Sequence, residues 1–365
     1  MTQIRDVTQY LETIAPRAYQ ESYDNAGLIT GDPQAEVRGI LVSLDAIESV
    51  VDEAIEQSCN LIVAHHPIVF RGLKSLTGRN YVERTLIKAI KNDIAIYAIH
   101  TNLDNVYNGV NAKIAEKLGL EQTRVLVPKS QTLQKLTTFV PHENAEAVLN
   151  ALSEAGAGNI GNYHNCSFQI SGTGTFEPNE QANPHIGEAG KLERVEEQRI
   201  EVILPNHLTD QVLRALRTAH PYEEVAYYLH NLENENQEVG SGMIGQLPEA
   251  MSASDFLKHL KQQMNLSVIR HTALLERPIS TVALCGGAGS FLLSSAIRQR
   301  ADAYVSADFK YHEFFDADGQ IMVADVGHYE SEVYTKELLR DFLCQKFVNF
   351  AIRLAKANTN PVFYT

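Results

Sequence analysis

Short apolar runs alternate with amphipathic segments at both ends of the chain, and this alternation most constrains the fold. In residues 1–128, apolar runs of strand length are separated by segments whose apolar residues recur at helical spacing. Residues 246–365 repeat this pattern. Because strands buried on both faces are typical of sheets covered by helices, the pattern predicts an α/β architecture with a buried sheet.

The boundaries of these elements can be predicted from where the periodicity changes. In the first part the predicted strands are Gly39–Leu44, Leu61–Ala64 and Ile94–Ile99, and the predicted helices are Ile47–Gln57, Val82–Lys91 and Val110–Leu118. In the last part the strands are Thr281–Leu284, Ala303–Val305 and Ile321–Asp325, and the helices are Ala253–Met264, Phe291–Arg298 and Ser331–Phe342. We expect the two parts to be the halves of one α/β enzyme domain.

The middle segment, residues 129–245, has a different pattern and contains an internal repeat. Val140-Pro141 and Val148-Leu149 match Leu204-Pro205 and Val212-Leu213, which lie 64 positions later. Each copy indicates a strand, a proline turn, an amphipathic helix and a further strand, so two copies predict an inserted ferredoxin-like α+β module. The expected domains are therefore 1–128 and 246–365 for the enzyme halves, and 129–245 for the insert.

Composition excludes several classes of protein. The four cysteines of this 365-residue chain are widely spaced without a C-x-x-C pair, which argues against a disulfide framework and a thiolate zinc site. A net charge of −14 with no Lys/Arg-rich block argues against duplex nucleic acid as a partner. No apolar run approaches membrane-spanning length, and the start lacks the pattern of a signal peptide, so we expect a cytoplasmic protein with no membrane partner.

Potential metal ligands follow two of the predicted strands in the first part. His65 and His66 end the run Leu61–Ala64, and His100 and Asp104 follow Ile94–Ile99. Because successive side chains on a strand point in opposite directions, the histidine pair can serve two different metal ions.

A third predicted strand, Ile321–Asp325, leads to His328 and Glu332, which are four residues apart and thus on one helical face. Each motif alone has an ordinary structural explanation, such as a capped loop, a turn or a helix cap. Together they place five donors at equivalent points of one sheet, at the carboxyl ends where open α/β sheets form their ligand crevice. Packing alone does not explain this convergence, since buried imidazoles and carboxylates must be satisfied.

Three imidazoles and two carboxylates suit zinc, manganese, iron or cobalt better than calcium or magnesium. The candidate ligands are His65, His66, Asp104, His328 and Glu332. Five ligands exceed what one catalytic ion takes while leaving a water position, so we expect two divalent ions per subunit bridged by Glu332. Zinc is the first expectation, with manganese or iron as alternatives. His100 and Glu330 are candidates for acid/base catalysis or for orienting a metal ligand, and His100 could instead be a sixth ligand.

Two further motifs point to substrate contacts. Gly286, Gly287 and Gly289 lie between a predicted strand and helix, where backbone N–H groups can bind phosphate, although a tight turn needs glycine in any case. Lys310 and His312 follow the next predicted strand and are candidates for substrate contacts or proton transfer. The alternative for this second motif is a solvated helix start capped by Asp308.

The motifs resemble those of the Nif-three-like family, whose bacterial members are known as GTP cyclohydrolase 1 type 2 homologues. The resemblance spans both outer segments, in order, although Tyr23 stands where the family commonly has tryptophan. The matching stretches are residues 21–28, 65–67, 100–104, 286–289, 308–313 and 327–332.

This resemblance implies a two-metal site on the same five residues and a ring-shaped homohexamer with its sites facing an internal cavity. It also implies that the middle segment is a PII/CutA-like insert that caps the openings of the ring. The implied function is metal-dependent hydrolysis of a nucleotide or similar phosphorylated small molecule, with GTP cyclohydrolysis as the named reaction. There, Glu332 would hold the ions, and His100, Lys310 or His312 would transfer protons. The alternatives are a regulatory or metal-handling protein whose insert senses a metabolite, and a two-metal phosphodiesterase.

Overall fold

A computed structural model describes the whole chain, residues 1–365, as two compact units. The first unit combines Met1–Pro128 with Gln237–Thr365, and the second is Lys129–Asn236. The sequence pattern predicts the second boundary at residue 245. The structure places it earlier because β10 (Asn236–Met251) pairs with β12 (Ile279–Ala288) of the first unit, with Met243 opposite Leu284.

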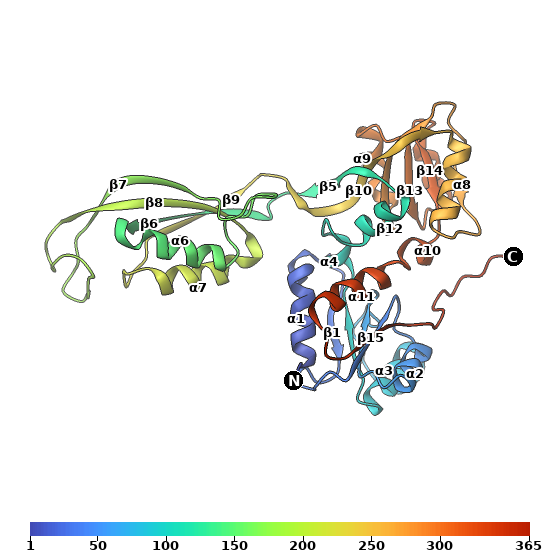
Figure 1. Ribbon diagram of the computed structural model, residues 1–365, viewed down its shortest axis with the longest axis horizontal. Helices are drawn as coiled ribbons and strands as arrows, with labels where there is room; N and C mark the ends of the chain where they lie inside the picture. The colour runs from blue at the N-terminus through green and yellow to red at the C-terminus, as the bar shows by residue number, and fades with distance from the viewer. The chain divides into compact units, whose positions relative to one another are not determined.

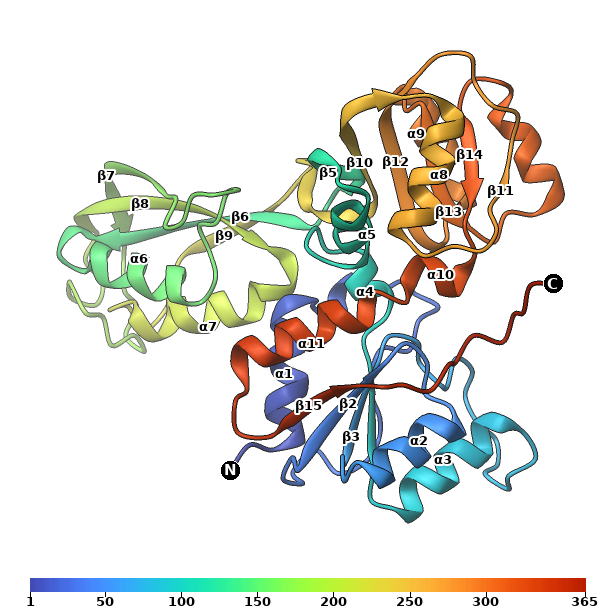
Figure 2. The same cartoon turned by 45° about the vertical axis from the view of Figure 1, so that its right-hand side comes forward.

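One sheet of the first unit has five strands in the order β1-β4-β3-β2-β15. The strands are β1 (Gly27–Thr30), β2 (Gly39–Ser43), β3 (Leu61–Ala64), β4 (Ala95–Ala98) and β15 (Ala351–Leu354). All neighbours are parallel except β1 and β4. The helices α2 (Glu48–Glu56) and α3 (Tyr81–Lys91) cover one face, where Leu41, Ile62 and Ile96 belong to a buried apolar cluster (Figure 2).

The other sheet of the first unit has six strands in the order β11-β14-β13-β12-β10-β5. Its remaining strands are β5 (Glu121–Lys129), β11 (Arg270–His271), β13 (Ala303–Ala307) and β14 (Met322–Asp325). The strands β12, β13 and β14 are parallel. The helix α9 (Leu293–Arg298) and the 3-10 helix η5 (Tyr311–Ala317) contribute to a separate apolar cluster with Ala283, Tyr304 and Val323 of this sheet.

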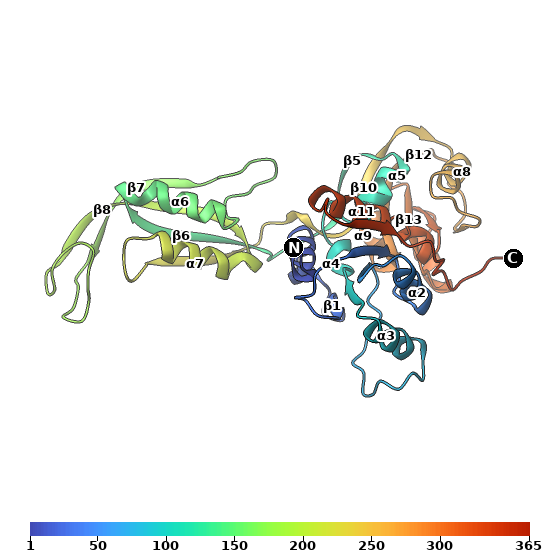
Figure 3. The ribbon, with the colours of Figure 1, turned by 60° about the horizontal axis from the view of Figure 1, so that its bottom comes forward.

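A single apolar core joins the two sheets. It contains Val42 and Val63 from the five-stranded sheet and Leu284 and Val305 from the six-stranded sheet. The longer helices that contribute to it are α1 (Ile4–Ile14), α5 (Val110–Leu118), α8 (Ala253–Gln263) and α11 (Thr335–Lys346), of which α5 and α11 are in contact (Figure 3). The predicted single sheet is therefore wrong. The halves of the chain also exchange strands, because β15 joins the first sheet and β5 joins the second.

The predicted helix Ser331–Phe342 is divided in the structure. A short helix, α10 (His328–Glu332), ends before α11 begins at Thr335. The residues that follow Asp325 therefore form a separate turn of helix that carries His328 and Glu332. No helix in the structure has the length and apolar character needed to cross a bilayer.

The second unit is a four-stranded antiparallel sheet with two helices (Figure 1). Its elements are β6 (Leu133–Pro141), α6 (Ala145–Glu154), β7 (Phe168–Phe176), β8 (Glu193–Pro205), α7 (Thr209–Ala219) and β9 (Tyr227–Leu232). The sheet order is β7-β8-β6-β9. The repeated Val148 and Val212 are both buried in the core of this unit, so the repeat in the sequence corresponds to its two helices.

We predict that Glu83 stabilises the loop before α3 in a pH-dependent way. Its buried carboxylate accepts hydrogen bonds from the Thr77 and Arg79 backbone N–H groups, at 2.8 and 3.1 Å, and these lower its pKa from 4.5 to about 2. A lowered carboxyl pKa contributes stability above the unfolded value that is lost as the pH falls through the folded value. E83Q should therefore lower the urea midpoint at pH 7, and its difference from wild type should shrink between pH 4.5 and 2.

The control is E56Q, at an exposed position of α2, which should leave the midpoint unchanged. A difference between E83Q and wild type that stayed constant over this pH range would show that the charge of Glu83 is irrelevant.

Candidate metal centre

The five predicted ligands lie together where strands of both sheets end. His65 and His66 follow β3, and Asp104 ends the short helix α4 (Thr101–Asp104) that follows β4. His328 and Glu332 are the first and last residues of α10, which follows β14 of the other sheet. The carboxyl ends of two sheets therefore form the site, whereas the sequence predicted one sheet.

The five residues form two groups of three that share Glu332. One group is His65, Asp104 and Glu332, and the other is His66, His328 and Glu332, with the donor atoms of each group within 4.8 Å of one another. Glu332 Oε1 lies 3.9 Å from His65 Nε2, while Oε2 lies 2.9 Å from His66 Nε2 and 3.1 Å from His328 Nε2. Each oxygen of one carboxylate thus faces a different group.

The first group contains two buried atoms without a hydrogen-bond partner. His65 Nε2 and Asp104 Oδ1 are both unsatisfied, and they lie 3.5 Å apart. A buried polar atom left unpaired costs about 1–3 kcal/mol. The His65 Nδ1 atom donates to the Ile99 carbonyl oxygen at 2.9 Å, so Nε2 of the neutral ring carries a lone pair. A cation between these atoms would satisfy both, and the residues present therefore fit a metal ion.

Carboxylates orient the imidazoles of the second group. The His66 Nδ1 atom donates to Asp45 Oδ1 at 2.7 Å, and His328 Nδ1 donates to Asp308 Oδ2 at 2.7 Å. A carboxylate that holds one ring nitrogen directs the other toward a metal and raises its basicity. The second group therefore has the oriented donors that a metal site requires.

The sequence motifs did not identify Asp45, and they indicated Asp308 only as a helix cap. Strand register explains both positions. Ser43 pairs with Ala64 in the parallel strands β2 and β3, so Asp45 and His66 each lie two residues beyond that pair. Ser306 pairs with Asp325 in β13 and β14, so Asp308 lies beside the start of α10. Aligning the carboxyl ends of neighbouring strands would have found both.

His100 belongs to the same site. Its ring centroid lies 5.3 Å from that of His65 and 5.4 Å from that of His66. The His100 Nδ1 atom donates to Asp24 Oδ1 at 2.8 Å, and the backbone N–H of Thr101 donates to Asp24 Oδ2 at 3.0 Å. Burial raises the pKa of Asp24, but the bonds from His100 and Thr101 outweigh it and lower the pKa to about 2. An ionised Asp24 therefore holds the His100 ring in place. A ring fixed in this way can act as a metal ligand or as a proton carrier.

The electrostatics of the site favour positive charge. Burial raises the pKa of the Glu332 carboxyl, but hydrogen bonds with His328 and His66 outweigh burial and hold the pKa well below its usual value. Burial and then the charge of Glu332 raise the pKa of Asp104 well above its usual value. Two close carboxyl groups in a buried place repel when ionised, and a cation between them relieves this repulsion.

The histidines differ in their pKa for physical reasons. Burial lowers the pKa of His65 to about 3, so this ring is neutral and able to bind a metal. Burial also lowers the pKa of His66 and His328, but hydrogen bonds with carboxylates outweigh it, raising these values to about 10 and about 9. The protons on these two rings offset part of the Glu332 charge, and an ion bound at Nε2 of either ring would displace the Nε2 proton.

The turn at Gly286 and Gly287 leaves space for the Glu332 carboxylate. Gly287 has φ +60°, and a Cβ atom there would lie 2.4 Å from Glu332 Oε1. The N–H groups of Gly286 and Gly287 donate to Asn111 Oδ1 and Ser331 Oγ at 3.0 and 2.9 Å. These two N–H groups are thus engaged within the protein. Phosphate binding by Gly286, Gly287 and Gly289 stays a prediction. The close approach of the Glu332 carboxylate to Gly287 explains why this turn needs glycine.

His312, in η5, and Lys310, which caps its start, are both exposed. The His312 ring packs against Tyr311 and Phe315, with centroids 5.2 and 6.2 Å apart. Lys310 precedes η5, and its backbone N–H donates to Glu313. Their contacts are therefore with η5 itself and not with the five ligands.

A cavity of about 410 Å³ lies beside the second group and is lined by His66, His328, Asp45 and Asp308 together with Arg270. We call it the metal-side cavity. Its wall includes Asn360, Pro361, Val362 and Tyr364, which follow β15. The Thr359 hydroxyl donates to Asp45, and the Asn360 side-chain amide donates to Glu330 at 3.0 Å, so this segment is fixed along the cavity. A small molecule in this space would contact the second group directly.

Comparison with known proteins agrees with the motifs. The Duf34/NIF3 (NGG1p interacting factor 3) family profile matches residues 2–361. A Halalkalibacterium halodurans protein named GTP cyclohydrolase 1 type 2 homolog is 41% identical over 361 residues, 97% of each chain. Its Bacillus subtilis namesake is 38% identical over 362 residues, 98% of this chain and 97% of the relative. The crystal structure of a Bacillus cereus protein related to NIF3 matches with a TM-score of 0.88 and 39% identity, covering 100% of this chain and 99% of that chain.

We predict that G287A reduces metal binding without unfolding the protein. The added Cβ would displace the Glu332 carboxylate that both groups share. The matched control is G119A, because Gly119 has a similar φ of +68° but no atom within 4 Å of an added Cβ. After loading with zinc, G287A should retain fewer ions per chain than wild type by elemental analysis, while G119A should retain the same number. Equal metal content in both variants would contradict the role given to this glycine.

Proposed function

The chain belongs to the Duf34/NIF3 family, and we propose that it is a hydrolase that uses two divalent metal ions per subunit, zinc first, with manganese or iron as alternatives. Its proposed substrate is a nucleotide or a similar phosphorylated small molecule. The observation that carries this proposal is the shared Glu332 carboxylate, whose two oxygens face two separate groups of donors.

Each residue of the site has a distinct role in this proposal. His65 and Asp104 would hold one ion, His66 and His328 would hold the other, and Glu332 would bridge them. When bound, the pair of ions supplies Lewis acidity, which lowers the pKa of a water molecule and offsets charge on the attacking and leaving oxygens.

His100 is the proposed proton carrier. Asp24 holds its Nδ1 atom, and the ring stands beside His65 and His66. The ring of Phe70 contacts it edge-on, with centroids 5.5 Å apart, and shields one side. A general acid or base must be within hydrogen-bond reach of the reacting group, which this position allows. Proton transfer by Lys310 or His312 stays a prediction.

The proposed chemistry is tested by incubating the metal-loaded protein with GTP. Formate and a pterin-type product would support GTP cyclohydrolysis, the reaction after which the relatives are named. Release of phosphate from a generic ester, without formate, would support the two-metal phosphodiesterase alternative. Turnover of neither substrate by protein that contains two ions would contradict the proposal that the site is hydrolytic.

We predict that E332Q loses both ions and lowers hydrolysis by about 100-fold or more, because it removes the charge that both groups share. The matched control is E330Q on the same helix, since Glu330 accepts a bond from Asn360 and belongs to neither group. E330Q should keep both ions by elemental analysis. E332Q protein that retained two ions and full activity would disprove the bridging role.

The assembly and the insert are also proposals. We propose that the second unit is a ferredoxin-type, PII/CutA-like insert; its strand order β7-β8-β6-β9 with a helix after β6 and another after β8 supports this. We propose a homohexamer, which is supported by exposed apolar side chains in the first unit at Phe70, Leu73 and Leu76.

We predict that light scattering of the full chain will give six times the subunit mass of 40.6 kDa. Replacing Leu73 and Leu76 by glutamate should lower that mass, because charged side chains oppose burial at an apolar interface. A monomer under all conditions would contradict the proposed hexamer.

A further inference from the structure

We propose that a second cavity, which shares Arg270 with the metal-side cavity, binds the flat ring of the substrate while Arg270 binds its anionic group. The ligand class is a nucleoside phosphate. This inference rests on the proposed function for the reacting end of the substrate, and it adds the residues that would recognise the rest.

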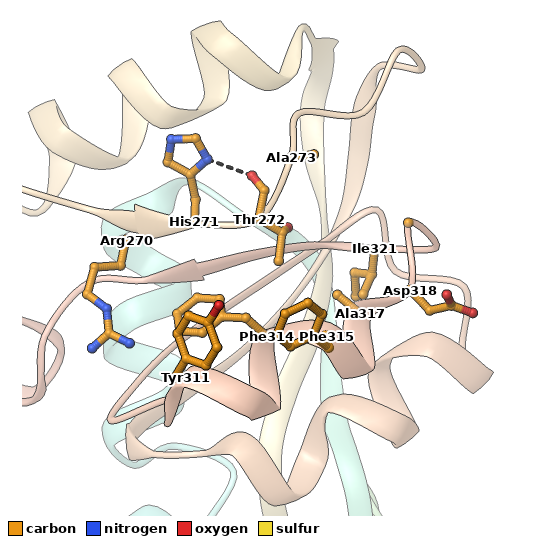
Figure 4. Close-up of a pocket in the computed structure, with 11 residues that line it drawn as sticks. Arg270, His271, Thr272, Ala273, Tyr311, Phe314, Phe315, Ala317, Asp318 and Ile321 are labelled. Atoms are coloured by element: carbon orange, nitrogen blue, oxygen red, sulfur yellow. Dashed lines mark hydrogen bonds between the residues drawn. The ribbon is translucent and has the colours of Figure 1, made fainter.

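The second cavity has a volume of about 840 Å³ and lies between β11 and η5. We call it the aromatic pocket. Tyr311, Phe314 and Phe315 of η5 line it, and Figure 4 shows their rings between Arg270 at one end and Asp318 at the other. Tyr311 is 72% exposed and Phe315 is 66% exposed. Exposed, adjacent aromatic side chains are unusual on a surface without a binding role, and they suit stacking against a flat ring.

Arg270 connects the two cavities, because its side chain lines both. One of its N–H groups donates to the Phe309 carbonyl oxygen at 2.6 Å, and its guanidinium lies 3.4 Å from the Asp325 carboxylate. These contacts fix the guanidinium, yet the side chain remains 57% exposed. Arginine has five N–H donors in a planar fork, so donors remain for a ligand.

The charge around Arg270 points to an anion that also contacts metal ions. Arg270 is the only lysine or arginine that lines the metal-side cavity, whose other charged walls include Asp45, Asp308 and Glu330. A lone anion would be repelled by these carboxylates. A phosphate that contacts both a cation on the second group and Arg270 would be balanced from two sides.

The chain connectivity places the ring site beside the metal site. Asp308, which orients His328, is three residues before Tyr311, the first residue of η5. Arg270 on β11 pairs with Asp325 at the end of β14, from which α10 continues. A nucleoside phosphate bound here has its phosphate toward the cations and its base in the aromatic pocket. This orientation favours phosphate-ester hydrolysis: water adds its oxygen to phosphorus, the P–O bond to the nucleoside breaks, and the nucleoside oxygen takes a proton.

Isothermal titration of the zinc-loaded full chain with GMP, guanosine and inorganic phosphate tests this inference. In the double variant Y311A/F315A, GMP should bind about tenfold or more weakly while phosphate binding is unchanged, because only the stacking surface is lost. In R270Q, both GMP and phosphate should bind about tenfold or more weakly, and R270K should recover part of this because it keeps the charge but not the fork. Y81A, at an exposed tyrosine that begins α3, should bind all three as wild type does.

Three results would overturn the inference. If GMP binds no more tightly than phosphate, the aromatic pocket does not bind the base. Equal GMP affinity in Y311A/F315A and wild type would lead to the same conclusion. A change of oligomeric mass in Y311A/F315A by light scattering would show that these rings form a subunit contact instead. Zinc content and turnover are measured on the same samples. Intact binding in a protein that hydrolyses nothing would therefore contradict the proposed function but not this inference.

Discussion

A single buried carboxylate, shared between two sets of donors, is the constraint on which the site depends. Glu332 must place one oxygen near His65 and Asp104 and the other near His66 and His328. Buried charge of this kind is stable only when it is balanced, and the protons on His66 and His328 offset part of the Glu332 charge. The remaining unsatisfied atoms, on His65 and Asp104, show where a cation would add stabilisation.

The fold meets this constraint by joining the ends of two sheets. Parallel register places Asp45, His66 and His100 at neighbouring strand ends, since Ser43, Ala64 and Ala98 are paired. The other sheet brings His328 and Glu332 on a short helix that contacts β12 and β13 and follows Val326, a residue of the shared apolar core. Gly287 then leaves the space that Glu332 occupies. Core packing, strand register and one glycine thus together position the donor atoms of the five proposed ligands.

Much of this could be predicted from the sequence. The strand ends and the donor types identified five residues that the structure brings together, and the extents of β3 and α5 were predicted to the residue. Periodicity shows that a strand is buried but not which sheet it joins, so the second sheet and the exchange of β5 and β15 were missed. Asp45 was missed because its role follows from register across strands. The break between Glu332 and Thr335 was missed because both sides have helical spacing.

Arg270 lines both the metal-side cavity beside His328 and the aromatic pocket beside Tyr311. One substrate molecule could therefore contact the ions and the aromatic rings together. The proposed hydrolysis and the proposed ligand orientation both require two ions, one on each side of the Glu332 carboxylate. The most direct test is anomalous diffraction from crystals of zinc-loaded protein, collected above and below the zinc edge. The account predicts two peaks per chain, one between His65, Asp104 and Glu332 and one between His66, His328 and Glu332. A single peak, or none at these residues, would contradict it.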